Sequence, residues 1–504
     1  MKVLPGGELR WLVLWAVALF AATLTLHTRH NDFPYFYHPD EAEKVRQVLT
    51  GEWNFHHPML LLTATKTALA GRSVKLPEQG VVEVGRGVSA GCVAAAVVAL
   101  ALLAFVCRGW TASLAAGGAL LLHHQLFELA HYMKEDSALL AGVAWTFLAA
   151  FLFWRKPGAG RAALLGAAVA VAISGKYVGA GMLAVALPVL WRVPGRRGSW
   201  LGWFAATLTV VLVVVNLPLL LDPGAFRQSF DREMGLVVHG QGGQRAVPHA
   251  QYWNIFRDNS TPVIWVLLAV FLTRRWRERR TVTLPEWLVI AFPFVFALAL
   301  SFSPKSNDRY FLPATAIFTL LAALGAVDAA RLLTRWVPWR WALAGVALAL
   351  VAGQVRGWRR YDAAFRSDDN AELLAWVRQL PPAAVISKDS RVRLPDPQSA
   401  EDARRFAPLP QRIMGGKRFA ADHGTVAEQR ARGVTHVAIS RSDYERFFLP
   451  GLRPRAGEEK EFARRRAFYA ELREVGEEVF RRERGTVLYL HPGLQVYRLP
   501  AVSE

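Results

Sequence analysis

The stretch "RGVSAGCVAAAVVALALLAFV", residues 86–106, contains no charged side chain after its first arginine. An α-helix needs about 20 such residues to cross the roughly 30 Å of hydrocarbon in a bilayer. The chain has 504 residues, of which 53% are hydrophobic, and its apolar residues recur in similar clusters. Ten further apolar segments lie near residues 11–27, 110–127, 136–154, 160–174, 177–192, 199–221, 261–273, 285–303, 309–332 and 340–357. The sequence therefore predicts a polytopic α-helical membrane protein with about 11 spans.

The basic residues of the chain predict the orientation of these spans. The formal net charge is +20, and much of it lies in short connections such as "CRGW", "WRKPGAGR", "WRVPGRRGSW", "TRRWRERR" and "RLLTRWVPWR". Short basic connections mark the cytoplasmic side of a membrane protein. This placement argues against nucleic acid as a partner, which would require a basic patch on one soluble face. We expect a multi-pass protein of the cell (inner) membrane with a cytoplasmic N-terminus.

An odd number of spans places the tail on the opposite, extracytoplasmic side, together with loops 28–85, 128–136 and 222–260. Residues 1–357 form the predicted transmembrane domain, and residues 358–504 form the tail. The tail alternates helical patterns with short apolar runs, which predicts a soluble α/β domain. The expected strands include "THVAIS" at 435–440, "TVLYL" at 486–490 and "LQVYRL" at 494–499.

The first external loop contains "FPYFYHPDEAEKVRQVLTGEWNFHHPMLLL" at residues 33–62. Asp40 and Glu41 are adjacent there, and neighbours on a helix point about 100° apart. One carboxylate can therefore work while the other anchors the helix. A simple N-cap for the helix that follows is the alternative for Asp40. His57, just before Pro58, is either a site residue or an interfacial side chain.

Two other segments bring ionisable residues to the same membrane boundary. "FELAHYMKEDSALL" at 127–140 contains Lys134 and Asp136, and "SFSPKSNDRYFLPATAIFTLL" at 301–321 contains Lys305, Arg309 and Tyr310. Acidic residues favoured at a helix start, and basic side chains that snorkel to the interface, are the alternatives. Taken together, a carboxylate base and several cations suit transfer from a membrane-borne phosphate donor to an acceptor.

Four motifs resemble the GT-C superfamily of membrane glycosyltransferases, and in particular bacterial proteins similar to protein O-mannosyltransferases and aminoarabinose transferases. These motifs are "HPDEA", "FHHPMLL", "HYMKEDSALL" and "DRYFLPATAIFTLLAALG". The resemblance implies a GT-C-like fold and a sugar donor linked to polyprenyl phosphate. It implies that Asp40 is the catalytic base, that Glu41 is its neighbour in the site, and that His57 belongs to an "HPP"-like turn.

The same resemblance implies that Lys134 meets the donor phosphate, that Asp136 is a second-loop acid, and that Arg309 and Tyr310 form the "RY" pair before a late helix. Some members of the superfamily use a divalent metal ion and others do not. His56, His57, Glu128, His131 and Asp136 could supply ligands, but their spacing assigns no metal site.

The sequence thus predicts an inverting glycosyltransferase that moves a hexosyl or pentosyl group from a polyprenyl-phosphate donor to a protein, lipid or glycan acceptor. The reaction would occur on the extracytoplasmic face of the lipid bilayer. Two alternatives stay open. A membrane transporter would move substrate into sealed vesicles without a covalent product, and a membrane-anchored binding or assembly protein would keep its activity in residues 358–504 alone.

Overall fold

The computed structural model describes residues 6–71, 76–239, 244–246, 251–303, 307–396, 402, 405–450, 452–454, 456–483, 487 and 489–500. The chain divides into two compact units. The membrane unit contains Met1–Tyr35, Pro39–Val238 and Pro248–Arg359. The α/β unit contains Phe36–His38, His239–Val247 and Arg360–Glu504. A short piece of the first external loop, Phe36–His38, therefore belongs to the α/β unit.

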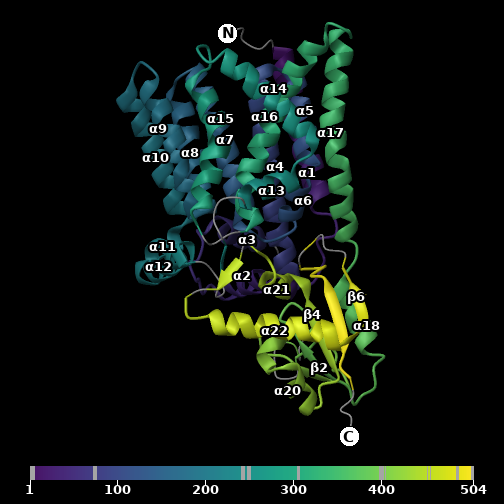
Figure 1. Ribbon diagram of the computed structural model, residues 1–504. Helices are drawn as coiled ribbons and strands as arrows, with labels where there is room; N and C mark the ends of the chain where they lie inside the picture. The colour runs from purple at the N-terminus through teal and green to yellow at the C-terminus, as the bar shows by residue number, and fades with distance from the viewer. Residues whose placement is uncertain are drawn as a thin grey trace. The chain divides into compact units, whose positions relative to one another are not determined.

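Helices make up the membrane unit (Figure 1). They are α1 (Gly6–His27), α2 (Pro39–Thr50), α3 (Leu60–Ala70), α4 (Glu78–Arg108), α5 (Trp110–Leu121), α6 (His124–Ala130), α7 (Glu135–Arg155), α8 (Ala159–Gly175), α9 (Leu183–Arg192), α10 (Arg197–Val215), α11 (Leu217–Leu221), α12 (Pro223–His239), α13 (Gln251–Asn259), α14 (Pro262–Arg277), α15 (Leu284–Ser301), α16 (Leu312–Leu333) and α17 (Trp339–Ala364).

The predicted helical membrane protein is confirmed, because all eleven apolar segments are mainly helical, although 110–127 is divided between α5 and α6 and 199–221 between α10 and α11. By length and composition, seven described helices can cross a membrane, or eight if the bent pair α13–α14 counts as one span. The shorter apolar helices include α5, α8 and the segment Tyr177–Arg192. Large apolar side chains on the outside of the unit, such as Trp11, Val214 and Leu221, are exposed. Lipid tails can cover such a surface, whereas water would disfavour it.

Small residues allow the central helices to pack closely. A Cβ added to Gly142 of α7 would lie 2.2 Å from the backbone nitrogen of Ala172 in α8, and one added to Gly175 would lie 2.5 Å from that of Leu139. Close backbone approach at glycine is typical of helix pairs in membranes. Helix α16 is buried along most of its length and packs against α14, α5 and α4. These helices form the fixed frame from which the external segments extend.

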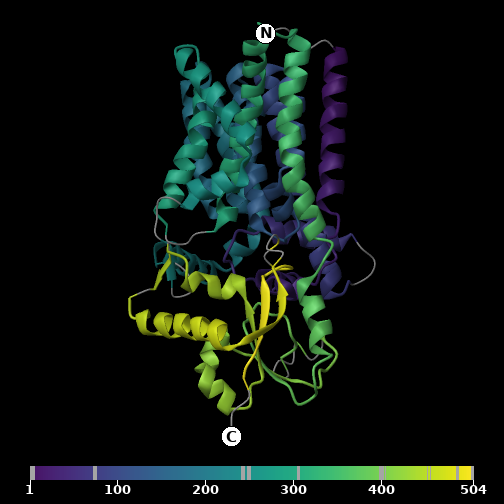
Figure 2. The same ribbon diagram turned by 45° about the vertical axis from the view of Figure 1, so that its right-hand side comes forward.

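The α/β unit, green to yellow in Figure 2, is built on a five-stranded sheet in the order β3-β2-β4-β7-β6. The strands are β2 (Val385–Lys388), β3 (Arg412–Met414), β4 (His436–Ser440), β6 (Glu477–Arg482) and β7 (Leu494–Arg498). Strand β2 is parallel to β3 and β4, with Ile386 opposite Ile413 and His436, whereas β7 is antiparallel to β4 and β6. A small pair, β1 (Gln244–Ala246) and β5 (Leu452–Pro454), is separate.

Helices α18 (Asp369–Val377), α20 (Val426–Ala431), α21 (Arg441–Tyr444) and α22 (Glu459–Val475) complete this unit. The predicted α/β domain is thus confirmed as a mixed α/β fold. Two of the three named strands correspond to β4 and β7. The strand predicted at 486–490 is wrong for its described residues, because Val487, Tyr489 and Leu490 lie in a bend and a turn. Strand β6, which precedes it, supplies the partner of β7 instead.

Candidate active site

Glu41 lies in the first turn of α2, and its side chain is fully buried against Arg86 of α4. The guanidinium donates from Nε and Nη2 to the two carboxylate oxygens, at 3.1 and 2.7 Å. Glu41 also accepts a hydrogen bond from the backbone nitrogen of Met133 at 2.7 Å, while Arg86 donates to the carbonyl of Phe33 at 2.8 Å. A bidentate pair of this kind fixes both distance and orientation. Glu41 therefore anchors α2 to α4 and to the segment before α7.

Asp40, the neighbour of Glu41, has a side chain that is 46% exposed. Its carboxylate contacts the ammonium group of Lys134 and lies 3.9 Å from Nη1 of Arg309. Because α2 begins at Pro39, Asp40 lies inside its first turn rather than before it. The two adjacent acids thus have separate environments, and only Asp40 presents a carboxylate that an incoming group can reach.

Lys134 is 2% exposed and precedes α7 directly. Its backbone nitrogen donates to the hydroxyl of Ser89 on α4 at 3.2 Å, which fixes the start of α7. Burial, and next the positive charge of Arg309, lower the pKa of the Lys134 ammonium to about 7. Desolvation disfavours the charged form of a buried lysine, and a neighbouring cation adds to that cost. The contact with Asp40 opposes both effects.

Asp136, in the first turn of α7, pairs with two cations from other segments. Lys176 Nζ lies 2.7 Å from Asp136 Oδ1, and Arg309 Nε lies 3.8 Å from Oδ2. Both cations lie near the ring of Tyr310, with the Lys176 nitrogen at 4.3 Å and the Arg309 guanidinium carbon at 5.5 Å from its centroid. Arg309 thus lies between Asp40 and Asp136, and it links the first external loop to the start of α16.

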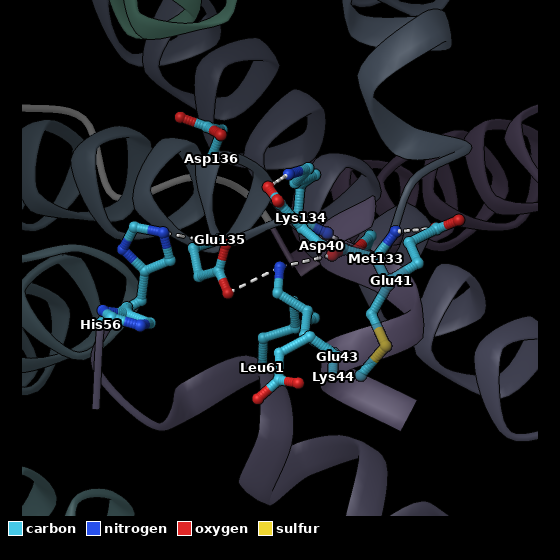
Figure 3. Close-up of polar contacts among 12 residues, drawn as sticks. Asp40, Glu41, Glu43, Lys44, His56, Leu61, Met133, Lys134, Glu135 and Asp136 are labelled. Carbon is cyan, nitrogen blue, oxygen red and sulfur yellow. Dashed lines mark hydrogen bonds and ion pairs between the residues drawn. The ribbon is translucent and has the colours of Figure 1, made fainter. Parts of the chain in front are cut away.

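A second ion pair lies beside the first (Figure 3). Lys44, one turn after Asp40 on α2, lies 2.7 Å from Glu135 and donates to the carbonyl of Met133 at 2.7 Å. On its other side, Glu135 lies 3.9 Å from His57 Nε2. Burial lowers the pKa of His57 to about 4, so this imidazole is neutral at pH 7. Two lysine–carboxylate pairs therefore join α2 to the start of α7. In one pair α2 supplies the lysine, Lys44, and in the other it supplies the carboxylate, Asp40.

A cavity of about 620 Å³ begins at this cluster of charges. Its polar lining includes His56, His57, Lys176, Glu233 and Tyr310. The remaining lining is mainly apolar and comes from Leu139, Ile173, Val178, Ala180, Phe230, Met234, Val237, Phe296, Ala299 and Leu300. A mostly apolar cavity with a few convergent polar groups is the usual form of a ligand site.

The backbone near the polar end of the cavity is strained. Phe55 has a φ of 50°, a value that is uncommon for a residue with a bulky side chain. The hydroxyl of Tyr177, which lines the cavity, donates to the carbonyl of Phe55 at 3.1 Å. Backbone strain that the surrounding structure maintains is concentrated at functional sites. The strained residue, Phe55, directly precedes His56 and His57, which line the cavity.

Three solved structures resemble this chain in fold to different degrees. The chain matches ArnT from Cupriavidus metallidurans bound to undecaprenyl phosphate with a TM-score of 0.52 and 15% identity, over 99% of each chain. The chain has the fold of ArnT. The apo state of the same protein matches with a TM-score of 0.49 and 14% identity, again over 99% of each chain. The arabinofuranosyltransferase AftD from Mycobacteria matches with a TM-score of 0.43 and 13% identity, over 97% of this chain and 42% of AftD.

No protein-family model and no curated protein matches the chain. The resemblance to the aminoarabinose transferases is therefore confirmed at the level of the fold, through ArnT. It extends over both the helical region and the α/β region, since 99% of each chain is aligned.

Most of the site residues predicted from the sequence lie in one cluster. Asp40, Lys134, Arg309 and Asp136 are joined by ion pairs, and Tyr310 lies against their cations. The other three predicted residues are outside this set of contacts. His57 contacts Glu135, Glu41 is buried against Arg86, and Lys305 lies outside the described residues.

Three residues of the cluster were missing from the predicted set: Lys44, Glu135 and Lys176. Lys44 follows Asp40 by four positions, a spacing that places two side chains on one face of a helix. Lys176 closely follows the apolar segment 160–174, so the sequence alone places it at the end of an apolar segment. No local signal connected it to Asp136, which lies 40 positions earlier.

The described residues contain no group of three or more His, Cys, Asp or Glu side chains arranged to hold a metal ion. Of the potential ligands considered from the sequence, His131 uses both ring nitrogens to contact backbone carbonyls, those of Phe127 at 2.6 Å and Arg29 at 2.7 Å. Asp136 is engaged by Lys176. His131 and Asp136 are therefore already engaged within the protein.

Proposed function

We propose that this protein is an inverting glycosyltransferase that moves a sugar from a polyprenyl-phosphate donor to an acceptor at the extracytoplasmic face of the membrane. One observation carries the proposal. Asp40 is the half-exposed carboxylate of the charge cluster, and it lies between Lys134 and Arg309. A base and phosphate-stabilising cations thus occur together, as transfer from a phosphate ester requires.

The cavity supports a lipid-linked donor. Lys176 and Tyr310 lie at its polar end, and its apolar lining suits a hydrocarbon chain. Arg309 is 19% exposed and Lys176 is 17% exposed, so both can reach a phosphate more readily than Lys134 can. The ArnT structure with the same fold contains undecaprenyl phosphate. We therefore assign the donor phosphate to Lys176 and Arg309, and the lipid chain to the apolar part of the cavity.

The proposed reaction is a single displacement. The Asp40 carboxylate takes the proton of an acceptor hydroxyl, and the acceptor oxygen forms a bond to the anomeric carbon of the sugar. The bond from that carbon to the phosphate oxygen breaks, and polyprenyl phosphate leaves with the electron pair. Attack opposite to the leaving group inverts the anomeric carbon. Cations at the leaving phosphate stabilise the charge that develops there, so no separate general acid is needed.

Lys134 has a positioning role in this scheme. Its ammonium contacts Asp40 and is 2% exposed, so its charge is directed at the base rather than at solvent. It holds the carboxylate toward Arg309, where the acceptor and the phosphate must meet. Glu135 and Asp136 are paired with Lys44 and Lys176. Those carboxylates are therefore less available as bases than Asp40 is.

The direct test is product analysis by mass spectrometry. Purified protein in detergent is incubated with a panel of polyprenyl-phosphate sugars and a membrane extract as acceptor. We expect consumption of one donor, release of polyprenyl phosphate and a glycosylated product of inverted configuration. If folded protein in sealed vesicles instead moves a substrate across the bilayer with no covalent product, the transporter alternative is supported and the proposal fails.

Replacement of Lys176 by methionine should weaken donor binding. The change removes the cation at the polar end of the cavity and leaves Asp136 paired only with Arg309. A hydrogen bond to a charged group contributes about 1.5–3 kcal/mol, so the KM for the donor should rise roughly tenfold or more. Lys66→Met, at an exposed lysine on α3, is the matched control and should leave KM unchanged. An unchanged donor KM in Lys176→Met would remove Lys176 from the phosphate site.

The pH profile tests the role of Lys134. Its pKa of about 7 means that the ammonium loses its proton as the pH rises through neutrality. The contact that positions Asp40 needs the charged form. We therefore expect kcat/KM to fall above about pH 7 in the wild type. An arginine stays charged throughout this range, so Lys134→Arg should abolish that decline. A decline that persists in Lys134→Arg would assign the titration to another group.

A further inference from the structure

The loops at one edge of the sheet in the α/β unit form a second cluster of cations, distant in sequence from Asp40. Strands β2, β3 and β4 are parallel, so their carboxyl ends lie at the same edge. The chain passes from β2 to β3 on one side and then to β4 on the other. Such a reversal in strand order is where α/β folds place ligands.

Hydrogen bonds confirm that these three loops meet. The carboxylate of Asp389, directly after β2, accepts from the backbone nitrogens of Ala420 at 2.7 Å and Ser440 at 2.9 Å. The hydroxyl of Tyr469 on α22 donates to the same group at 2.6 Å. The backbone nitrogen of Ser390 donates to the carbonyl of Arg418 at 3.0 Å. The edge is therefore held at several points, and its side chains are fixed relative to one another.

Three guanidinium groups gather at this edge around one buried carboxylate. Asp443 accepts from the backbone nitrogen of Arg391 at 3.1 Å, and its Oδ1 lies 3.7 Å from Arg391 Nε. The guanidinium carbons of Arg418 and Arg446 lie 5.1 and 5.9 Å from the ring centroid of Phe419. Burial, and next the charge of Arg418, lower the pKa of Arg446 to about 10. A neighbouring positive charge adds to the cost of removing a cation from water.

The positive charge at this edge exceeds its counter-charge. Arg465 also lies at the ring of Phe419, but it is paired with Asp422 at 2.7 Å. Within the described residues, Arg418 and Arg446 have no ion pair, and the buried Nε of Arg446 has no hydrogen-bond partner. A buried donor without a partner is costly and implies that a ligand group can supply one.

The loop after β3 contributes two cations to this edge. It reads Gly415-Gly416-Lys417-Arg418, and Gly416 has a φ of +76°, a conformation that suits glycine. Lys417 and Arg418 are exposed, so the cations face solvent rather than the core. The glycines of this loop lie against the carboxylate of Asp396, so the guanidinium groups, which bind phosphate through paired hydrogen bonds, are the groups available to an anion.

We propose that this edge of the sheet, formed by Arg391, Arg418 and Arg446, is a binding site for a phosphate group. Three guanidinium groups lie near the two carboxylates of Asp443 and Asp389, so the cations outnumber the carboxylates, which favours an anion such as phosphate. The phosphate belongs either to a small soluble molecule or to a lipid headgroup. The site involves none of the residues proposed for glycosyl transfer, so the two proposals stand or fall separately.

The test uses the full-length chain in a neutral detergent at low ionic strength. Pyrophosphate binding is measured by titration calorimetry for the wild type and for Arg418→Gln/Arg446→Gln. We expect the double variant to lose one saturable site or to bind at least tenfold more weakly. Arg412→Gln is the matched control, because Arg412 is exposed at the start of β3, on the opposite edge, and should bind as the wild type does. Arg418→Gln alone, at an exposed position, serves if the double variant melts early.

A second arm identifies the source of the phosphate. Mixed micelles that contain phosphatidic acid are compared with micelles of phosphatidylcholine, in the same variants. Binding of phosphatidic acid but not of pyrophosphate, lost in the double variant, assigns the site to a lipid headgroup. Binding of pyrophosphate assigns it to a soluble phosphate. If the wild type binds neither probe, or if the double variant binds both as the wild type does, the proposal is overturned.

Discussion

Replacement of Asp40 by asparagine should reduce glycosyl transfer by about 10²–10⁴-fold, the range expected when a general base is lost. Asparagine has nearly the same shape but cannot accept a proton from the acceptor hydroxyl. The change should leave the fold intact, because the Asp40 side chain is 46% exposed and its buried partner Lys134, with a pKa of about 7, can lose its proton when the counter-charge is removed. Product formation is measured by mass spectrometry, with donor binding measured in parallel. We expect kcat to fall while the donor KM changes little.

Asp32→Asn is the matched control for this prediction. Asp32 lies on the same external loop, eight positions earlier, and is exposed. Its backbone carbonyl, rather than its carboxylate, accepts a hydrogen bond from Gln79. Transfer by Asp32→Asn should therefore match that of the wild type. Wild-type transfer by Asp40→Asn would assign the base to another group and remove the central argument for the function.

The membrane helices could be predicted because their signal is local. An apolar segment such as 86–106 can satisfy its backbone hydrogen bonds within itself in hydrocarbon only by forming a helix. The structure extends that helix to Glu78–Arg108, so that Arg86 lies inside the helix rather than at its start. Segments that are short, such as 160–174 and 261–273, were nevertheless found as helices α8 and α14.

The candidate site could be predicted only in part. The adjacency of Asp40 and Glu41 indicated that one would work and the other would anchor, and the structure shows which one is buried. The partner of that anchor, Arg86, follows 45 positions later, and nothing local connects the two. Ion pairs between distant segments depend on how helices pack, which a single sequence does not encode at any one position.

Strand β6 was not predicted, because its sequence carries little of the pattern that marks a strand. Its residues, Glu477–Arg482, read "EEVFRR", and only Phe480 is buried. An edge strand covered with charges gives almost no alternating apolar pattern, although such charges are typical of protected sheet edges. The more apolar "TVLYL" was therefore predicted as the strand, whereas its described residues form a bend and a turn. Pairing with β7 across Phe480 and Val496 decides the register instead.

Glu41→Gln should cause the largest loss of stability among single changes in the external loop. Glutamine preserves the shape and can still accept the hydrogen bond from Met133, but it leaves the Arg86 guanidinium fully buried without a counter-charge. Breaking a buried ion pair from one side costs about 3–5 kcal/mol. We expect a clear drop in the melting temperature of the protein in detergent. Unfolding is measured through the fluorescence of its 18 tryptophans.

The control for this prediction lies two positions along the same helix. Glu43 pairs with Arg46 at 2.7 Å, but the side chains of that pair are 39% and 49% exposed. Exposed pairs contribute little, since water and salt screen them, so Glu43→Gln should leave the melting temperature nearly unchanged. The double variant Glu41→Gln/Arg86→Gln should recover part of the loss, because no uncompensated charge stays buried. If Glu41→Gln melts like Glu43→Gln, the buried pair does not anchor α2, and Asp40 must be held in place by Lys134 and Arg309 alone.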